Sequence, residues 1–261
     1  MLGQERKTGS SDLPWAKIFS DYNLSNHNFE KGPYYITAEQ IKSSTREFST
    51  TGQREVRILC KQDTRDKRPQ VFKDRGLFIL PVKNGQYAIL KGEGYIDVPE
   101  INSNMVCYSS KLDYELITSQ VGNSEMQHLD FAYATSLLRT FLKDESLVLT
   151  IRGRKYTPKF SFRVGNQKLK VESVQTEVDA GYEGRDKLVL VEAKNKKSKD
   201  TIIRQLYYPF RQWQTYTSKQ VYTIFFEQNE SIYSIWQFGF AEVDDYNSIQ
   251  LIKSARYKIN Q

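Results

Sequence analysis

The stretch that decides the fold is Val174–Lys194, which reads VQTEVDAGYEGRDKLVLVEAK. In the first half Gln175, Glu177 and Asp179 alternate with Thr176, Val178 and Ala180, and the second half is an apolar run that ends in charges, so each half predicts a β-strand. An extended first strand places Glu177 and Asp179 on one face. Glu192 and Lys194 share a face of the second strand. The turn is predicted to use Gly181, Gly184 and Asp186. The resulting hairpin would bring Asp179, Glu192 and Lys194 close to one another.

The second strand carries its charges at the end of an apolar run. Leu188–Val191 predicts burial on both faces, and burial of an unpaired Glu or Lys costs several kcal/mol. A divalent cation would compensate, and carboxylates with waters are the usual ligands of Mg²⁺. We therefore expect Asp179 and Glu192 to hold Mg²⁺, with Lys194 orienting or deprotonating a water. Glu177 is either a third ligand or the partner of a nearby Lys or Arg.

A helix is expected after these strands. We expect Ser198 or Asp200 to cap it and Pro209 to kink or shorten it, because proline removes a backbone donor. Its predicted buried stripe is Ile203, Leu206, Phe210 and Trp213, and its predicted polar face is Gln205, Tyr208 and Gln212.

Val178-Asp179, thirteen residues before Glu192-Ala193-Lys194, resembles the motif of the PD-(D/E)XK nuclease superfamily, with Val178 at the proline position. Gln205-Leu-Tyr-Tyr208 is similar to the signature that several of these families carry on the following helix. There the Gln helps to position the water or the metal shell, although Gln205 could also cap a neighbouring carbonyl. With RQLYYPFRQW, the motifs further resemble bacterial type II restriction endonucleases. The resemblance covers about 174–217.

The fold class expected from the resemblance is α/β (α+β): a restriction-endonuclease-like core with a mixed central sheet flanked by helices. The sequence itself predicts a helix over 125–143, capped by Asn123-Ser124, and strands over 147–152, 159–164 and 169–174, the last two joined by Gly165-Asn166. We expect residues 111–261 to form the catalytic domain and residues 1–110 to form a DNA-recognition region.

The N-terminal region is predicted to form a smaller α+β unit. Thr37-Ala-Glu-Gln40 is a capping box, Arg54–Cys60 alternates as a strand, and Pro69 predicts the start of a helix that ends near Gly76. Asn84-Gly85 predicts a two-residue hairpin turn in which both positions need positive φ. This order is compatible with a winged helix, and equally with an unrelated α+β domain. In a winged helix the helix beside the hairpin would carry Lys67, Arg68, Lys73 and Arg75.

The positive charge is concentrated in one segment. The chain has 38 Lys and Arg against 31 Asp and Glu, and between residues 151 and 220 the count is 16 against 7, so this segment holds the whole excess. Such a surplus favours a polyanionic partner, and phosphate neutralisation is independent of sequence. The expected DNA contacts near the carboxylates are Arg152, Arg154, Lys155, Lys196, Arg204 and Arg211. The loops around Lys155 and Asn166 are candidates for base reading.

Several classes are disfavoured by composition. Two cysteines cannot form a disulfide framework, and the two histidines have no metal-ligand spacing, so neither a secreted mini-fold nor a zinc site is expected. The start of the sequence is polar and no run spans a bilayer, so we expect a cytoplasmic protein without a membrane partner.

The resemblance implies a type II restriction endonuclease, a hydrolase that cuts double-stranded DNA at a specific site with Mg²⁺ and leaves 5′-phosphate ends. A palindromic site would require a homodimer or sequential nicking. Such an enzyme belongs to a restriction-modification system, so a DNA methyltransferase gene is expected nearby. The alternatives are a structure-specific or repair nuclease of the same superfamily, and a non-catalytic winged-helix DNA-binding regulator.

Overall fold

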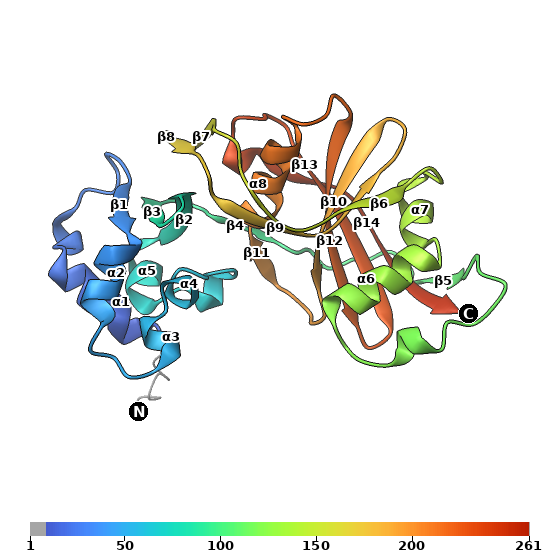
Figure 1. The fold of residues 1–261 in the computed structure, drawn as a ribbon, viewed down its shortest axis with the longest axis horizontal. Helices are drawn as coiled ribbons and strands as arrows, with labels where there is room; N and C mark the ends of the chain where they lie inside the picture. Colours follow the sequence, from blue (N-terminus) through green and yellow to red (C-terminus); the bar gives the residue numbers. More distant parts are fainter. Residues whose placement is uncertain (1–8, 261) are drawn as a thin grey trace. The chain divides into compact units, whose positions relative to one another are not determined.

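The computed structural model describes residues 9–260, which fold into two compact units (Figure 1). The first contains residues 9–96, Lys159–Val174 and Asp200–Ile202; the second contains Asp97–Pro158, Gln175–Lys199 and residues 203–260. The predicted division at residue 110 is therefore not the one that these units follow. Two segments from the second half of the sequence belong to the first unit. No helix within 9–260 is long and apolar enough to cross a membrane.

The first unit combines short helices with a three-stranded antiparallel sheet of order β1-β3-β2. Trp15 is central to its core: the indole contacts the Phe72 ring edge-on at 4.7 Å and donates to the Leu59 carbonyl at 3.1 Å. Its helices are α1 (Asp12–Asp21), η1 (Leu24–Asn26), α2 (Ala38–Thr45), α3 (Thr51–Arg54), α4 (Val56–Leu59), η2 (Arg65–Lys67) and α5 (Gln70–Arg75). Its strands are β1 (Tyr34–Thr37), β2 (Leu77–Lys83), β3 (Gln86–Lys91), β7 (Phe160–Val164), β8 (Gln167–Val171) and β11 (Asp200–Ile202), which pairs with β4 (Tyr95–Asp97).

Local signals in this unit are mostly confirmed. Thr37 and Gln40 form the predicted capping box, and α5 ends at Gly76 with φ of 63°. The hairpin around Asn84-Gly85 is confirmed, but only Gly85 has positive φ (75°), because a bulge near Val82 alters the turn.

The predicted strand over Arg54–Cys60 is wrong. This segment lies in α3 and α4, where main-chain groups bond locally, as in Cys60 N–H to the Val56 carbonyl at 2.9 Å. Val56 and Leu59 are buried three residues apart, which is a helical spacing, whereas Ile58, which alternation would place on the same face as Val56, is exposed. Short apolar runs do not distinguish the two structures.

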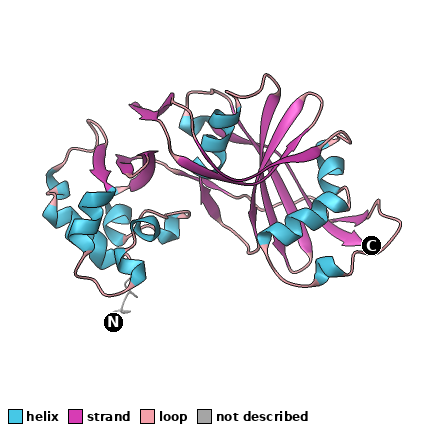
Figure 2. Cartoon of the chain, viewed as in Figure 1, coloured by secondary structure: helices cyan, strands magenta, loops and turns pink. Residues whose placement is uncertain are grey.

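The second unit contains a seven-stranded mixed sheet of order β5-β14-β13-β12-β10-β9-β6. Figure 2 shows its strands in magenta with cyan helices beside them. β10 pairs in parallel with β12 and β14 with β5, while the other neighbours are antiparallel. The predicted mixed sheet flanked by helices is confirmed. Its strands are β5 (Val106–Ser109), β6 (Val148–Tyr156), β9 (Gln175–Glu183), β10 (Lys187–Lys194), β12 (Gln220–Asn229), β13 (Ile232–Phe240) and β14 (Ile249–Asn260), and the remaining elements are η3 (Thr118–Gln120), α6 (Glu125–Ala134), α7 (Leu137–Leu142), α8 (Arg204–Trp213) and η4 (Tyr246–Ser248).

The two faces of this sheet are covered by different helices. Val189, Val191 and Ala193 belong to the apolar core shared with α6 and α7. Leu190 and Glu192, which alternate with them, line a small pocket with Leu206 of α8. The alternation of β10 therefore sends its charged end residue Glu192 toward α8, because successive side chains of a strand point to opposite faces.

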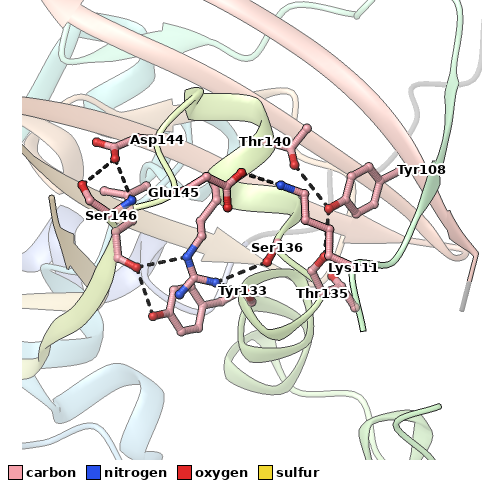
Figure 3. A network of polar contacts seen from close by, with 11 residues as sticks. Tyr108, Lys111, Tyr133, Thr135, Ser136, Thr140, Asp144, Glu145 and Ser146 are labelled. Carbon is pink, nitrogen blue, oxygen red and sulfur yellow. Dashed lines mark hydrogen bonds and ion pairs between the residues drawn. The ribbon is translucent and has the colours of Figure 1, made fainter. Parts of the chain in front are cut away.

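The single helix predicted over 125–143 is instead two helices. Ser136 breaks it with φ of 65°, and the Thr135 hydroxyl bonds back to the Phe131 carbonyl at 2.9 Å. Figure 3 shows how the break is held: the Tyr108 hydroxyl donates to the Thr135 carbonyl at 2.8 Å and lies 3.3 Å from the Thr140 hydroxyl. These contacts come from a distant strand, so local periodicity could not reveal them. The Ser124 cap is confirmed by its bond from Gln127 N–H.

Helix α8 differs from prediction at both ends. Neither Ser198 nor Asp200 caps it: Ile203 precedes it without a side-chain cap, and Asp200 lies in β11. Trp213 is only half-buried, whereas Gln212 is buried and joins α8 to two strands, accepting from the Thr176 hydroxyl at 2.5 Å and donating to the Tyr156 carbonyl. The helix continues through Pro209.

Gly181 lies within β9 rather than in the predicted turn, because the strand must pass close to β6. A Cβ atom at this position would stand 2.6 Å from Ile151 Cβ. We expect Gly181→Ala to lower the free energy of unfolding by about 1–3 kcal/mol, the usual cost of overpacking. Denaturant titration measures this, and the loss caused by Gly181→Ala should be smaller in an Ile151→Gly background, which lacks the contacting Cβ atom, than in the wild-type background. Equal losses from Gly181→Ala in the two backgrounds would contradict the contact.

Candidate functional site

The candidate site lies where β9 and β10 separate. Their paired residues end at Ala180 and Val191, and beyond this point the Asp179 carboxylate accepts the Ala193 N–H at 2.8 Å through Oδ2. A side chain thus takes the place of a main-chain acceptor. This bond fixes the Asp179 carboxylate beside the Glu192-Ala193-Lys194 end of β10.

A bulge in β9 places Asp179 there. Against β6, Gly181 pairs with Ile151 and Val178 with Gly153, so three steps on β9 match two on β6. Val178 lines the pocket under α8, whereas Ala180 belongs to the core under α6 and α7. The side chains on either side of Asp179 therefore do not alternate simply between the two faces of the sheet. The expectation that Glu177 and Asp179 lie on one face depended on that alternation.

Glu177 lines the same small pocket as Glu192 and Gln205, and its charge adds to burial in raising the pKa of Asp179. Its side chain is more than half exposed and pairs with Arg154, with Nε 3.3 Å from Oε2. Of the two roles open from the sequence, the partner of a nearby Arg is the one that this contact supplies.

Glu192 is the most connected member of the site. It is only 8% exposed, and one of its oxygens, Oε1, accepts from Lys194 Nζ and from Gln205 Nε2, the latter at 2.6 Å. Lys194 Nζ also donates to the Ala193 carbonyl at 3.1 Å. Two donors from different elements thus converge on one buried carboxylate oxygen. Of the two roles open for Gln205 from the sequence, this bond supplies a place in the carboxylate cluster.

The surroundings of Asp179 favour its neutral form, whereas those of Lys194 favour its charged form. Burial raises the pKa of Asp179, and the Ala193 N–H and the Lys194 ammonium only partly oppose it. Burial would lower the pKa of Lys194, but the Glu192 carboxylate outweighs it, so the pKa is raised above the ordinary value. Lys194 is therefore a charged ammonium at neutral pH, which favours orienting a water or stabilising negative charge over abstracting a proton.

Glu125, at the start of α6, belongs to this neighbourhood. Its charge raises the pKa of both Asp179 and Lys194. The segment is tied to the end of β10 by Asn195 Nδ2, which donates to the Asn123 carbonyl at 3.1 Å. Glu125 lies more than 50 residues before Asp179, so its place near the strands depends on how α6 packs.

Asp179 and Glu192 are the predicted Mg²⁺ ligands, with Glu177 as the third candidate. Within 9–260, no three His, Cys, Asp or Glu side chains are grouped so that they could hold a metal ion, so a three-carboxylate set with Glu177 is not assembled. A two-carboxylate set still fits Mg²⁺, which keeps several waters and binds through one or two carboxylates. In the described chain, Asp179 Oδ1 accepts no hydrogen bond, and a cation would favour the charged form of this carboxylate.

The predicted DNA-contact residues of the second unit lie in different environments. Lys155 and Lys196 are exposed, while Arg204 is half-buried. Arg152 pairs with Asp130 and donates to the Asp179 carbonyl at 3.5 Å. Arg211 is tied to the Tyr207 hydroxyl, the Val243 carbonyl and Asp244. Arg152 and Arg211 thus have protein partners that a phosphate would have to compete with.

The four basic residues predicted on one helix of the first unit do not share it. Only Lys73 and Arg75 lie in α5; Lys67 is in η2, and Arg68 follows it. Arg68 donates to the Leu77 carbonyl at 3.2 Å, and Arg75 donates to the Ser25 carbonyl at 3.3 Å. The helix begins after Pro69 and ends at Gly76 as predicted, so Lys67 and Arg68, which precede Pro69, fall outside it.

Glu227 was missed by the sequence reasoning. It is 6% exposed on β12, opposite Lys194 in the register, and accepts the Ser198 N–H at 2.8 Å. Burial raises its pKa. It thereby holds the basic loop that follows Lys194. An acidic residue at the end of the apolar run on β12 was the available signal.

Two family models match the chain. Residues 12–89 match a domain of unknown function, DUF6996, and residues 90–258 match a second, DUF6997, which covers more than half of the sequence. The chain belongs to the DUF6997 family. The DUF6997 match includes Asp179, Glu192, Lys194 and Gln205. Neither family description names an activity, and comparison with curated proteins and with solved structures gives no match.

Proposed function

We propose that this protein is a Mg²⁺-dependent nuclease that hydrolyses phosphodiester bonds of double-stranded DNA. The observation that carries the proposal is the convergence of Lys194 and Gln205 on one oxygen of buried Glu192, with Asp179 held beside it through Ala193 N–H. A structural ion pair needs neither the Gln donor nor a second, poorly solvated carboxylate. Acid, acid-x-Lys and Gln lie on β9, β10 and α8, in the order that the superfamily resemblance requires.

The residues have distinct roles in this proposal. Asp179 and Glu192 would hold Mg²⁺, which when bound polarises the phosphate and acidifies a water. Lys194, as an ammonium, orients the attacking water and stabilises negative charge that develops on the phosphate. Gln205 keeps the Glu192 carboxylate in position. Water attacks phosphorus, the bond to the 3′ oxygen breaks, and the products carry a 5′-phosphate and a 3′-hydroxyl.

We further propose that the first unit assists DNA recognition and that cleavage is site-specific, as in type II restriction. The order α1, β1, α2, α5, β2 and β3, with the short helices α3 and α4 between α2 and α5, supports a winged-helix interpretation, as do the sheet order β1-β3-β2 and the turn at Asn84-Gly85. A homodimer and a neighbouring methyltransferase gene remain expectations that follow from site-specific cutting.

Digestion of supercoiled plasmid tests the proposal. We expect nicked and linear products with Mg²⁺ and none with excess chelator, and a discrete fragment pattern on a longer substrate. Cutting without sequence preference would favour a repair or structure-specific nuclease. Plasmid that stays intact over a range of Mg²⁺ and Mn²⁺ concentrations, although the protein still retards it on a gel, would overturn the enzymatic proposal and favour a regulator.

A further inference from the structure

The β7–β8 hairpin in the first unit presents a cationic face. Its strands alternate strictly between buried and exposed residues. The buried set is Phe160, Phe162, Val164, Leu169 and Val171, and the exposed set is Ser161, Arg163, Lys168 and Lys170. Three of these four exposed side chains are basic. This part of the positive surplus therefore lies in a different unit from the carboxylates, although the sequence places it beside them.

The register brings these charges together. Arg163 lies directly opposite Lys168, at a spacing where Cβ atoms are about 5 Å apart. Lys159 interacts with Lys170 and lowers its pKa through a side-chain hydrogen bond and charge repulsion. Like charges directly opposite each other destabilise a strand pair. Glu172 is the one acidic residue in the sequence from 159 to 172. The face therefore gathers four basic side chains in a segment with one acidic residue, a concentration of positive charge that attracts a polyanion.

The hairpin is also held firmly within its unit. Near the turn, Gln167 Nε2 donates to the Phe29 carbonyl at 2.9 Å, and at the base Glu172 N–H donates to the Val82 carbonyl at 3.0 Å. The apolar side chains of β7 and β8 are all buried, so these two strands offer no exposed aromatic or aliphatic side chain that could insert into a membrane. The cationic face therefore presents charged and polar side chains in fixed positions, which suits the phosphate groups of a rigid partner.

We propose that this face, formed by Lys159, Arg163, Lys168 and Lys170, binds the phosphate backbone of duplex DNA. The choice of DNA rests on the proposed function. Lys168 and Lys170 are two residues apart on one strand, about 6.8 Å by strand geometry, so they can contact separate phosphates. Such contacts position the duplex and carry no sequence information. The first unit would then hold DNA through β7–β8 independently of α5.

Fluorescence anisotropy with a short duplex in excess chelator tests this, because no cleavage then occurs. Removal of one phosphate-binding side chain should make the slope of log affinity against log salt concentration shallower by about 0.9. It should also lower affinity by roughly tenfold near 0.1 M salt. We therefore expect Lys168→Gln/Lys170→Gln to lower the slope by about 2 and affinity by roughly a hundredfold. Lys168→Glu should bind weakly without a lower melting temperature, since it places opposite charges across from each other.

Lys258→Glu is the matched control, an equal charge change at an exposed lysine on β14. Similar losses in Lys258→Glu and Lys168→Glu, or an unchanged slope in the double Gln variant, would overturn the proposal. So would wild-type binding to anionic vesicles that exceeds binding to DNA and is lost in the double variant. The nuclease proposal is tested separately by cleavage. If the wild-type protein does not cut DNA but these variants lose affinity, the hairpin site stands and the nuclease proposal fails. If the protein cuts DNA and the variants keep full affinity, only the hairpin proposal fails.

Discussion

Replacement of Lys194 by Met should reduce plasmid cleavage by at least roughly 10²- to 10³-fold, the cost of removing one preorganised charge from a reaction centre. The expectation follows from the contact of Lys194 Nζ with Glu192 and from its raised pKa, which keeps the ammonium charged beside the proposed reacting phosphate. DNA affinity in chelator should change little, because the ammonium is one charge among many. Single-turnover cleavage and anisotropy on the same samples measure the two effects.

The Lys194 variant is also expected to lose about 1–3 kcal/mol of stability, because Glu192 keeps its burial and loses a donor. The double variant Glu192→Gln/Lys194→Met removes both charges and should recover stability without recovering cleavage. Lys187→Met, on the same strand and also ion-paired, should cut normally. Normal cleavage by Lys194→Met, or recovery of cleavage in the double variant, would place the active site elsewhere.

The second large effect is expected at Asp179, where two substitutions should separate chemistry from structure. Asp179→Asn keeps a side-chain oxygen for the Ala193 N–H and should abolish cleavage by removing a metal ligand and its charge. Asp179→Ala should also abolish cleavage, but it leaves the Ala193 N–H without this acceptor and should cost about 1–3 kcal/mol of stability.

The free energy of unfolding should depend on pH in a direction that the pKa of Asp179 sets. Its pKa is raised in the folded protein, mainly by burial, so folding favours the protonated carboxyl. That contribution is fully present below the ordinary pKa of 3.8 and is lost as the pH rises through the folded pKa. Without metal, Asp179→Asn should therefore be more stable than wild type at pH 8, with a smaller difference near pH 4. Urea titrations in chelator measure this, and a destabilised Asn variant at pH 8 would contradict it.

Glu177 and Glu125 show how far the candidate site could be predicted. The sequence identified Asp179, Glu192, Lys194 and Gln205, and the structure brings their side chains to the end of β10. It also favoured Glu177 as a ligand as much as a surface partner, and it could not choose because the β9 bulge that interrupts the alternation is set by pairing with β6. Glu125 lies far along the chain, so its proximity depends on how α6 packs.

Local chemistry was determined by the sequence itself. The capping box at Thr37, the turns at Gly85 and Gly165, and the alternation of β10 each depend on a few neighbouring residues, whose preferences act within one turn or one strand. The concentration of basic residues between 151 and 220 was equally plain from composition.

Only the tertiary structure decided which of these local elements belong together. The break at Ser136, the bulge at Asp179 and the placement of β7–β8 in the first unit all depend on partners far along the chain. The physical reason is that burial and strand pairing are satisfied by whatever surface lies opposite, and local propensity is too weak to oppose them. The single basic segment of the sequence is thereby divided between the carboxylate site and a separate cationic hairpin.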